Sequence, residues 1–169
     1  MTMFACRRGA TTATVVACVL AAVTPAAAAA PVDLLLPAGV ACAGFAVRLQ
    51  APADPRVARE FPAAHGRLAR SILAGTGTQV TLTNQSTGKQ VRLQPNGAVT
   101  RTTFNPDGQT RTVTSTGHIV LVLFPTDVPA GPSTTLIVGR VVYTADRAEN
   151  FVVKRITGRT TDLCAALAA

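Results

Sequence analysis

Short segments in which apolar and polar residues alternate recur along the chain after residue 44. In the first of them, Phe45, Val47 and Leu49 alternate with Ala46, Arg48 and Gln50. A period of two places all the apolar side chains on one face of a β-strand. The same pattern, rich in Thr and Val, predicts strands over 80–83, 91–93, 99–104, 110–115, 134–143 and 151–157.

Turn sequences separate these strands. Asn84–Gly88, Asn105–Gly108 and Ala145–Asn150 are polar and include residues that favour turns. Pro95-Asn96-Gly97 contains an Asn-Gly pair, which tolerates the positive φ that a tight hairpin turn requires. We therefore expect successive antiparallel hairpins.

Three segments depart from this alternation. Six consecutive apolar residues, Ile119–Phe124, predict a strand that is covered on both faces, and a loop with three prolines follows it. The tail, Thr161–Ala168, predicts one or two helical turns held in place by Cys164. The lead, Pro31–Pro37, is flanked by prolines, and we assign no strand to it.

Residues 51–77 are interrupted by prolines and glycines, which exclude one long helix. A hairpin with strands over Val57–Phe61 and Arg67–Leu73, and a turn at Pro62–Gly66, fits this segment best; a short helix over 67–73 is the alternative. The segment also predicts a basic surface patch, formed by Arg56, Arg59, Arg67 and Arg70.

Eight to ten short strands predict an all-β fold in one domain, residues 31–169. Because consecutive hairpins usually pair in space, we expect a single antiparallel meander that closes into a small β-barrel. A β-sandwich is the alternative.

The first thirty residues differ from the rest. Arg7 and Arg8 precede a stretch of about 14 uncharged residues, which ends at Pro25 and a run of alanines. This order is typical of a secretory signal peptide, cleaved near Ala29 or Ala30, and predicts a secreted protein. The apolar stretch is shorter than the ~20 residues that span a bilayer, and no second one follows, so we expect no transmembrane segment in the mature chain.

Two other interpretations of the leader are weaker. Val15–Cys18 is similar to a lipobox, which would make Cys18 a lipidation site, but the apolar stretch before it is short. Arg7-Arg8 lacks the hydrophobic pair that follows a twin arginine in export signals.

Charge and cysteine content change once the leader is removed. The 169-residue chain carries a net charge of +8; without Arg7 and Arg8, fourteen basic residues face eight acidic ones, which gives +6. A moderate positive charge favours association with anionic surfaces such as cell-wall phosphates. Two cysteines remain, Cys42 and Cys164, and in an oxidising compartment an even pair predicts a disulfide.

Six short segments are distinctive when taken together: Cys42–Val47, Thr81–Asn84, Pro106–Gly108, Pro129–Gly131, Gly139-Arg140 and Asp162–Leu167. Through these segments the chain resembles a family of small secreted actinobacterial β-rich proteins for which no activity is known. Each segment alone is unspecific, so the resemblance implies a compartment and an architecture but no reaction.

Motifs that carry chemistry are scarce. The chain contains no G-x-S-x-G, H-E-x-x-H, P-loop or C-x-x-C motif, and we expect no cofactor and no metal site. His118, Tyr143 and Arg140 are the weak catalytic candidates, at the mouth of a barrel. One Tyr and no Trp argue against nucleic-acid binding.

These features favour a non-catalytic exported domain that binds anionic cell-envelope polymers or a small apolar ligand. The alternative is a small barrel enzyme, similar to a cyclase or isomerase, with its site in the barrel mouth.

Overall fold

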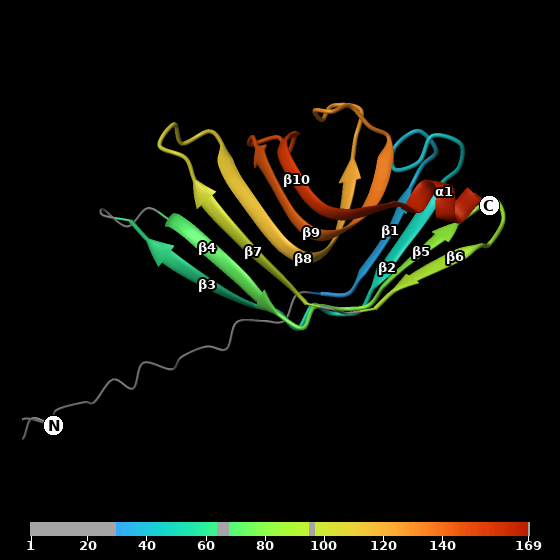
Figure 1. Cartoon of the computed structure of the whole chain (residues 1–169), viewed down its shortest axis with the longest axis horizontal. Helices are drawn as coiled ribbons and strands as arrows, with labels where there is room; N and C mark the ends of the chain where they lie inside the picture. Colours follow the sequence, from blue (N-terminus) through green and yellow to red (C-terminus); the bar gives the residue numbers. More distant parts are fainter. Residues whose placement is uncertain (1–29, 64–67, 95–96, 169) are drawn as a thin grey trace, which may run out of the picture.

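The computed structural model describes residues 30–63, 68–94 and 97–168. It consists of two antiparallel sheets and one short helix (Figure 1). The four-stranded sheet has the order β1-β2-β5-β6, and the six-stranded sheet has the order β10-β9-β8-β7-β4-β3. The elements are β1 (Val32–Leu36), β2 (Val47–Ala51), β3 (Val57–Pro62), β4 (Leu68–Gly75), β5 (Val80–Asn84), β6 (Gln90–Leu93), β7 (Ala98–Phe104), β8 (Arg111–Leu123), β9 (Ser133–Ala145), β10 (Phe151–Asp162) and α1 (Leu163–Ala168).

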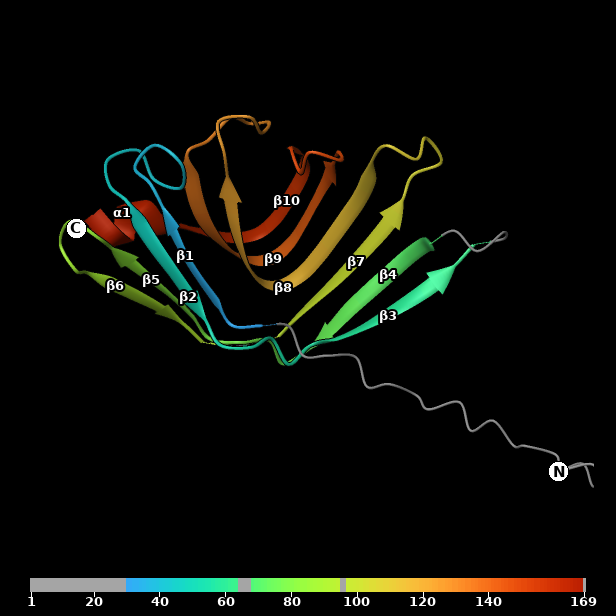
Figure 2. The same cartoon turned by 180° about the vertical axis from the view of Figure 1, so that it is seen from behind.

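The two sheets meet where the chain crosses between them three times. The crossings run from β2 to β3, from β4 to β5 and from β6 to β7. The neighbours β2, β5 and β6 of one sheet continue into β3, β4 and β7 of the other, which are neighbours in the same order. Each connected pair of strands therefore forms one long ribbon that passes from one sheet into the other. Figure 2 shows the ribbons diverging from this junction toward opposite ends of the molecule.

Strands β8, β9 and β10 continue past the junction but bend sharply (Figure 1). The bend falls on a row of glycines, because Gly117 pairs with Gly139 and Gly139 pairs with Gly158. All three have φ between +107° and +156°, a region that side chains disfavour. The bend carries residues 118–123 of β8, 133–138 of β9 and 159–162 of β10 away from β6, which pairs only with β5.

Substituting Gly158 tests the importance of this bend. A Cβ at Gly158 would lie 2.3 Å from the carbonyl oxygen of Val138, so Gly158→Ala forces the backbones apart. We expect the free energy of unfolding to fall by about 2–3 kcal/mol, measured by urea denaturation. Gly44→Ala is the control, since its Cβ would meet nothing within 4 Å. Equal stability of the two variants would contradict this role for the bend.

Separate apolar clusters cover the two faces of the β8–β9 hairpin. On one face, Val120, Val122 and Leu136 pack against a buried cluster that includes Leu82 of β5 and Leu163 of α1. On the other face lie the members of a second cluster: Leu121, Leu123, Ile137 and Val141, with Ile119, Tyr143, Phe151 and Val153 packed against them. The prediction of a strand covered on both faces is confirmed for 119–123, whereas Phe124 lies beyond the end of β8.

Helix α1 and the disulfide close the first cluster. Leu163 and Leu167 are fully buried, and the Asn84 side-chain amide donates a hydrogen bond of 3.2 Å to the Leu167 carbonyl. Cys42 and Cys164 form the predicted disulfide, with their Cα atoms 5.6 Å apart. The helical tail is therefore confirmed as well.

The structure corrects three other expectations. The strands form two sheets and not a single meander, and each sheet has two end strands in the described residues, so neither is a closed barrel there. The hairpin interpretation of 57–73 is correct and the helix over 67–73 is wrong, because β3 and β4 pair in antiparallel register. The proline-flanked lead contains a strand, β1, whose partner is β2.

Candidate binding surface

The three catalytic candidates do not form one site, although His118 and Arg140 lie on the same side of the β8–β9 pair, two positions apart in register. His118 is exposed and lines a cavity of about 530 Å³ at the junction of the sheets, to which neither Tyr143 nor Arg140 contributes. Tyr143 packs against the second cluster, with its ring centroid 4.7 Å from that of Phe151, and burial raises the pKa of its hydroxyl. Arg140 lies three residues earlier on β9 and therefore points to the opposite face. The expectation of one site at a barrel mouth is wrong for this trio.

The arginines of the predicted basic patch do not lie on one surface, because Arg56 pairs with Asp54 apart from Arg59 and Arg70. Arg56 turns toward Asp54, whose carboxylate accepts hydrogen bonds from its side chain and its backbone N–H. Arg59 and Arg70 do share one face of the β3–β4 hairpin, because they occupy alternate positions of the paired strands. Arg67 lies outside the described residues.

The face that carries Arg59 continues across the whole six-stranded sheet. One cross-strand row illustrates this: Arg59 pairs with Ile72, which pairs with Arg101, and the row reaches Arg155 on β10. Adjacent rows on the same side add more basic residues. We call this side the arginine face; its arginines are Arg59, Arg70, Arg101, Arg140, Arg155 and Arg159.

Threonines fill the space between these arginines. They are Thr103, Thr112, Thr114, Thr116, Thr144 and Thr157. Two shallow hollows of about 360 and 270 Å³ lie on this surface and share Arg140 as a common wall. The hollows therefore form a discontinuous groove across β7, β8, β9 and β10, lined by hydroxyl and guanidinium groups and by the side chains of Val99 and Val142.

The arginine face carries no acidic residue on the described strands. Glu60 points to the opposite side of β3, because it lies next to Arg59 in the chain, and Asp162 does so on β10. In the described part of the chain, none of the six arginines forms an ion pair. Five are exposed, and Arg70 is half-buried because its guanidinium lies 4.5 Å from the centroid of the Phe61 ring.

The acidic residues are used elsewhere. Three pair with other arginines: Asp33 with Arg48, Asp54 with Arg56 and Glu149 with Arg111. The hydrogen bond from Arg48 lowers the pKa of Asp33, and that from Arg56 lowers the pKa of Asp54. Four more accept backbone N–H groups in turns or at the start of α1: Asp107, Asp127, Asp146 and Asp162. The positive charge of the arginine face is thus left without an internal counter-charge.

The described residues contain neither a candidate metal site nor a helix that could span a membrane. His, Cys, Asp and Glu side chains form no group of three or more that would hold a metal ion there. No helix among the same residues has the length and apolar character needed to cross a bilayer.

Comparison with known protein families, with curated proteins and with solved structures finds no match to this chain. The resemblance to small secreted actinobacterial proteins stays a prediction.

Proposed function

We propose that this protein is an exported, non-catalytic binding protein whose arginine face holds an anionic polymer of the cell envelope. The observation that carries the proposal is the segregation of charge: six arginines on five strands share a face without a carboxylate. The body is best classed as an open, sandwich-like pair of sheets, because α1 and the four-stranded sheet pack on one side of β8 and β9.

The chemistry of the face suits repeated phosphate groups. A guanidinium is always charged and presents a planar fork that matches phosphate geometry, and the neighbouring hydroxyls add donors. Five strand spacings of about 4.8 Å separate β3 from β10, so the arginines extend over roughly 24 Å. One small anion would meet only one or two of them, whereas a linear polymer would contact several at once and gain affinity from their linkage.

A phosphate polymer without bases fits the face better than a nucleic acid does. Single-stranded nucleic acids bind through aromatic side chains on which bases stack. Phe61 is the one aromatic residue on the described strands of this face, and Arg70 lies over its ring. The threonines offer hydrogen bonds to sugar or glycerol hydroxyls instead.

Export completes the proposal. A disulfide is typical of an oxidising compartment, where envelope polymers are present, and the leader has the sequence of a secretory signal. Mass spectrometry of protein secreted by an expressing bacterium would give its N-terminus, for which we expect Ala30 or Pro31.

The binding test uses a purified poly(glycerol phosphate) chain and the whole protein, with titration by calorimetry from 50 to 500 mM NaCl. We expect affinity to fall steeply with salt, because binding releases condensed counterions. In Arg101→Gln/Arg140→Gln, binding should weaken by about 10- to 100-fold at low salt, and the slope of log affinity against log salt should decrease by about two.

The matched control is Lys89→Gln/Arg147→Gln, which removes the same charge away from the arginine face. We expect less than a twofold change for this pair. Equal losses in both double variants would mean that net charge alone attracts the polymer, and the proposal would fail. It would also fail if affinity did not depend on salt, or if single-stranded DNA of equal charge bound as tightly.

A further inference from the structure

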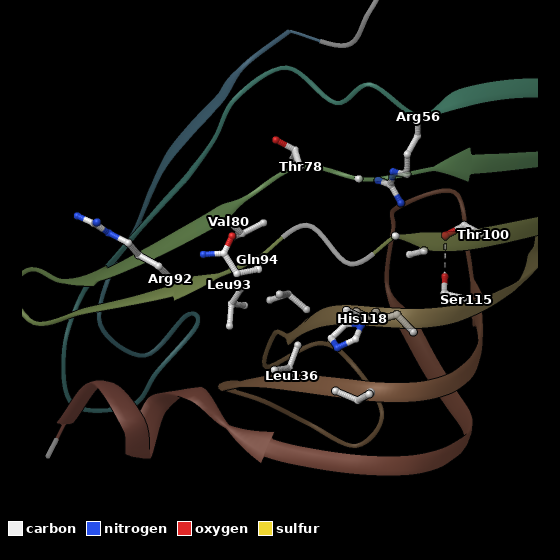
Figure 3. A pocket seen from close by; sticks show the side chains of 16 residues that line it. Arg56, Thr78, Val80, Arg92, Leu93, Gln94, Thr100, Ser115, His118 and Leu136 are labelled. Atoms are coloured by element: carbon white, nitrogen blue, oxygen red, sulfur yellow. Dashed lines mark hydrogen bonds between the residues drawn. The ribbon is translucent and has the colours of Figure 1, made fainter.

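A cavity lies at the junction of the two sheets, and its lining includes His118 and Val138, whose cross-strand row ends at Arg159 of the arginine face. The cavity of about 530 Å³ opens where β6 and β8 separate, and its walls come from β5 and β6 on one side and from β7, β8 and β9 on the other (Figure 3). This volume is in the range of small-molecule sites, about 300–1,000 Å³. Its existence follows from the glycine bend, which removes β8 from the edge of β6.

One end of the cavity is apolar. Its lining there is formed by Val80 and Leu93 from the four-stranded sheet and by Val120 and Leu136 from the β8–β9 hairpin. The same four side chains pack against the buried cluster beneath α1. A ligand group at this end would contact hydrocarbon and extend the core, so the end favours an alkyl chain over a polar group.

The other end is polar and basic. Figure 3 shows the Arg56 side chain pointing into the cavity, with His118 across from it and the hydroxyls of Thr100 and Ser115 beside them. The two hydroxyls lie 2.9 Å apart and hydrogen-bond to each other. No acidic side chain lines the cavity in the part of the chain that the structure describes.

Asp54 fixes the orientation of the Arg56 side chain. Asp54 accepts from its Nε at 2.8 Å and from its Nη2 at 2.5 Å, and this carboxylate also accepts from the Arg56 backbone N–H. Nη1 has no partner among the described residues. The guanidinium is therefore oriented by one carboxylate while a donor nitrogen stays free for another anion.

We propose that this cavity binds an amphiphile with a single anionic head group and an unbranched apolar tail. The head would accept hydrogen bonds from Arg56 and His118, and the tail would lie between β5–β6 and β8–β9. The proposal does not depend on polymer binding at the arginine face, because the cavity and the two hollows of that face share no lining residue.

The test measures binding of three C12 probes below their micelle concentrations, by calorimetry and by native mass spectrometry: dodecanoate, dodecyl phosphate and dodecanol. We expect both anions to bind at least about tenfold more tightly than the alcohol, since a hydrogen bond to a charged group is the stronger kind. The ratio of the two anions tells a carboxylate ligand from a phosphate monoester.

Two variants locate the site. Arg56→Gln should weaken the anions about tenfold and leave dodecanol unchanged, whereas Arg147→Gln, with the same charge change outside the cavity, should leave all three unchanged. Ala98→Leu adds bulk to the lining and should abolish binding of all three probes while polymer binding at the arginine face persists. Circular dichroism checks that the Arg56→Gln and Ala98→Leu proteins fold.

Three results would overturn the proposal. One is the absence of binding by any probe, and another is equal affinity for dodecanol and dodecanoate. The third is unchanged dodecanoate binding in folded Arg56→Gln or folded Ala98→Leu protein. Loss of polymer binding alone would count against the proposed function and not against this site.

Discussion

Removing the Cys42–Cys164 bridge should lower the free energy of unfolding by about 4–5 kcal/mol. The two residues are 122 positions apart, so the bridge restricts almost the whole described chain when it unfolds. In the chain-entropy model, stabilisation grows with loop length and reaches about 4.7 kcal/mol for a 100-residue loop. The measurement is urea denaturation of Cys42→Ser/Cys164→Ser beside the oxidised protein.

The contacts around the disulfide indicate whether the protein still folds without it. Cys42 is buried in the first cluster, next to Leu163 and Leu167 of α1. Without the bridge, Leu163 and Leu167 still bury the helix, and Asn84 still bonds its last turn. We therefore expect a folded but less stable double variant. A fall of less than 1 kcal/mol would mean that the unfolded chain is already compact enough to hold these ends together.

The positions of the strands could be predicted from the sequence because a period of two is a local signal. Val47 and Leu82 lie on alternating segments, and both are fully buried. The disulfide followed from the count of cysteines beyond the leader. Strand β1 was missed, because Leu34–Leu36 shows no alternation and prolines flank it.

The arginine face could not be predicted, because it depends on register. Arg59, Arg101 and Arg155 are more than forty residues apart in the chain, and only pairing across six strands places them in one row. Arg56 and Arg59 looked equivalent in the sequence, yet Asp54 binds the first and nothing binds the second in the described residues. Sequence proximity therefore located two members of the surface, Arg59 and Arg70, and did not assign the other four to it.

The row of glycines also depends on strand register and could not be predicted from the sequence. Gly117, Gly139 and Gly158 are each unremarkable in the sequence, where an isolated glycine in a strand suggests only a bulge. Once paired, they bend three strands together and create the cavity at the junction. Both proposed sites thus arise from cross-strand pairing, which local patterns do not contain.

Replacing Asp127 should have an effect comparable to loss of the disulfide. Its side chain is 3% exposed, and its two carboxylate oxygens accept the backbone N–H groups of Phe124 at 2.6 Å and Phe151 at 2.7 Å. The first bond shapes the loop after β8, and the second fixes that loop to the start of β10. We expect Asp127→Ala to lower the free energy of unfolding by about 3–6 kcal/mol, since each hydrogen bond to a charged group contributes about 1.5–3 kcal/mol.

Asp107→Ala is the matched control for this prediction. Asp107 also accepts two backbone N–H groups in a turn, from Gln109 and Thr110, but it is exposed, so water replaces the lost carboxylate. The free energy of unfolding of the Asp107→Ala protein should change little. Asp127→Asn should be intermediate, because one oxygen remains to accept one N–H group. If urea denaturation gave equal losses for Asp127→Ala and Asp107→Ala, local turn formation would explain both, and the link between the loop and β10 would not stabilise the fold.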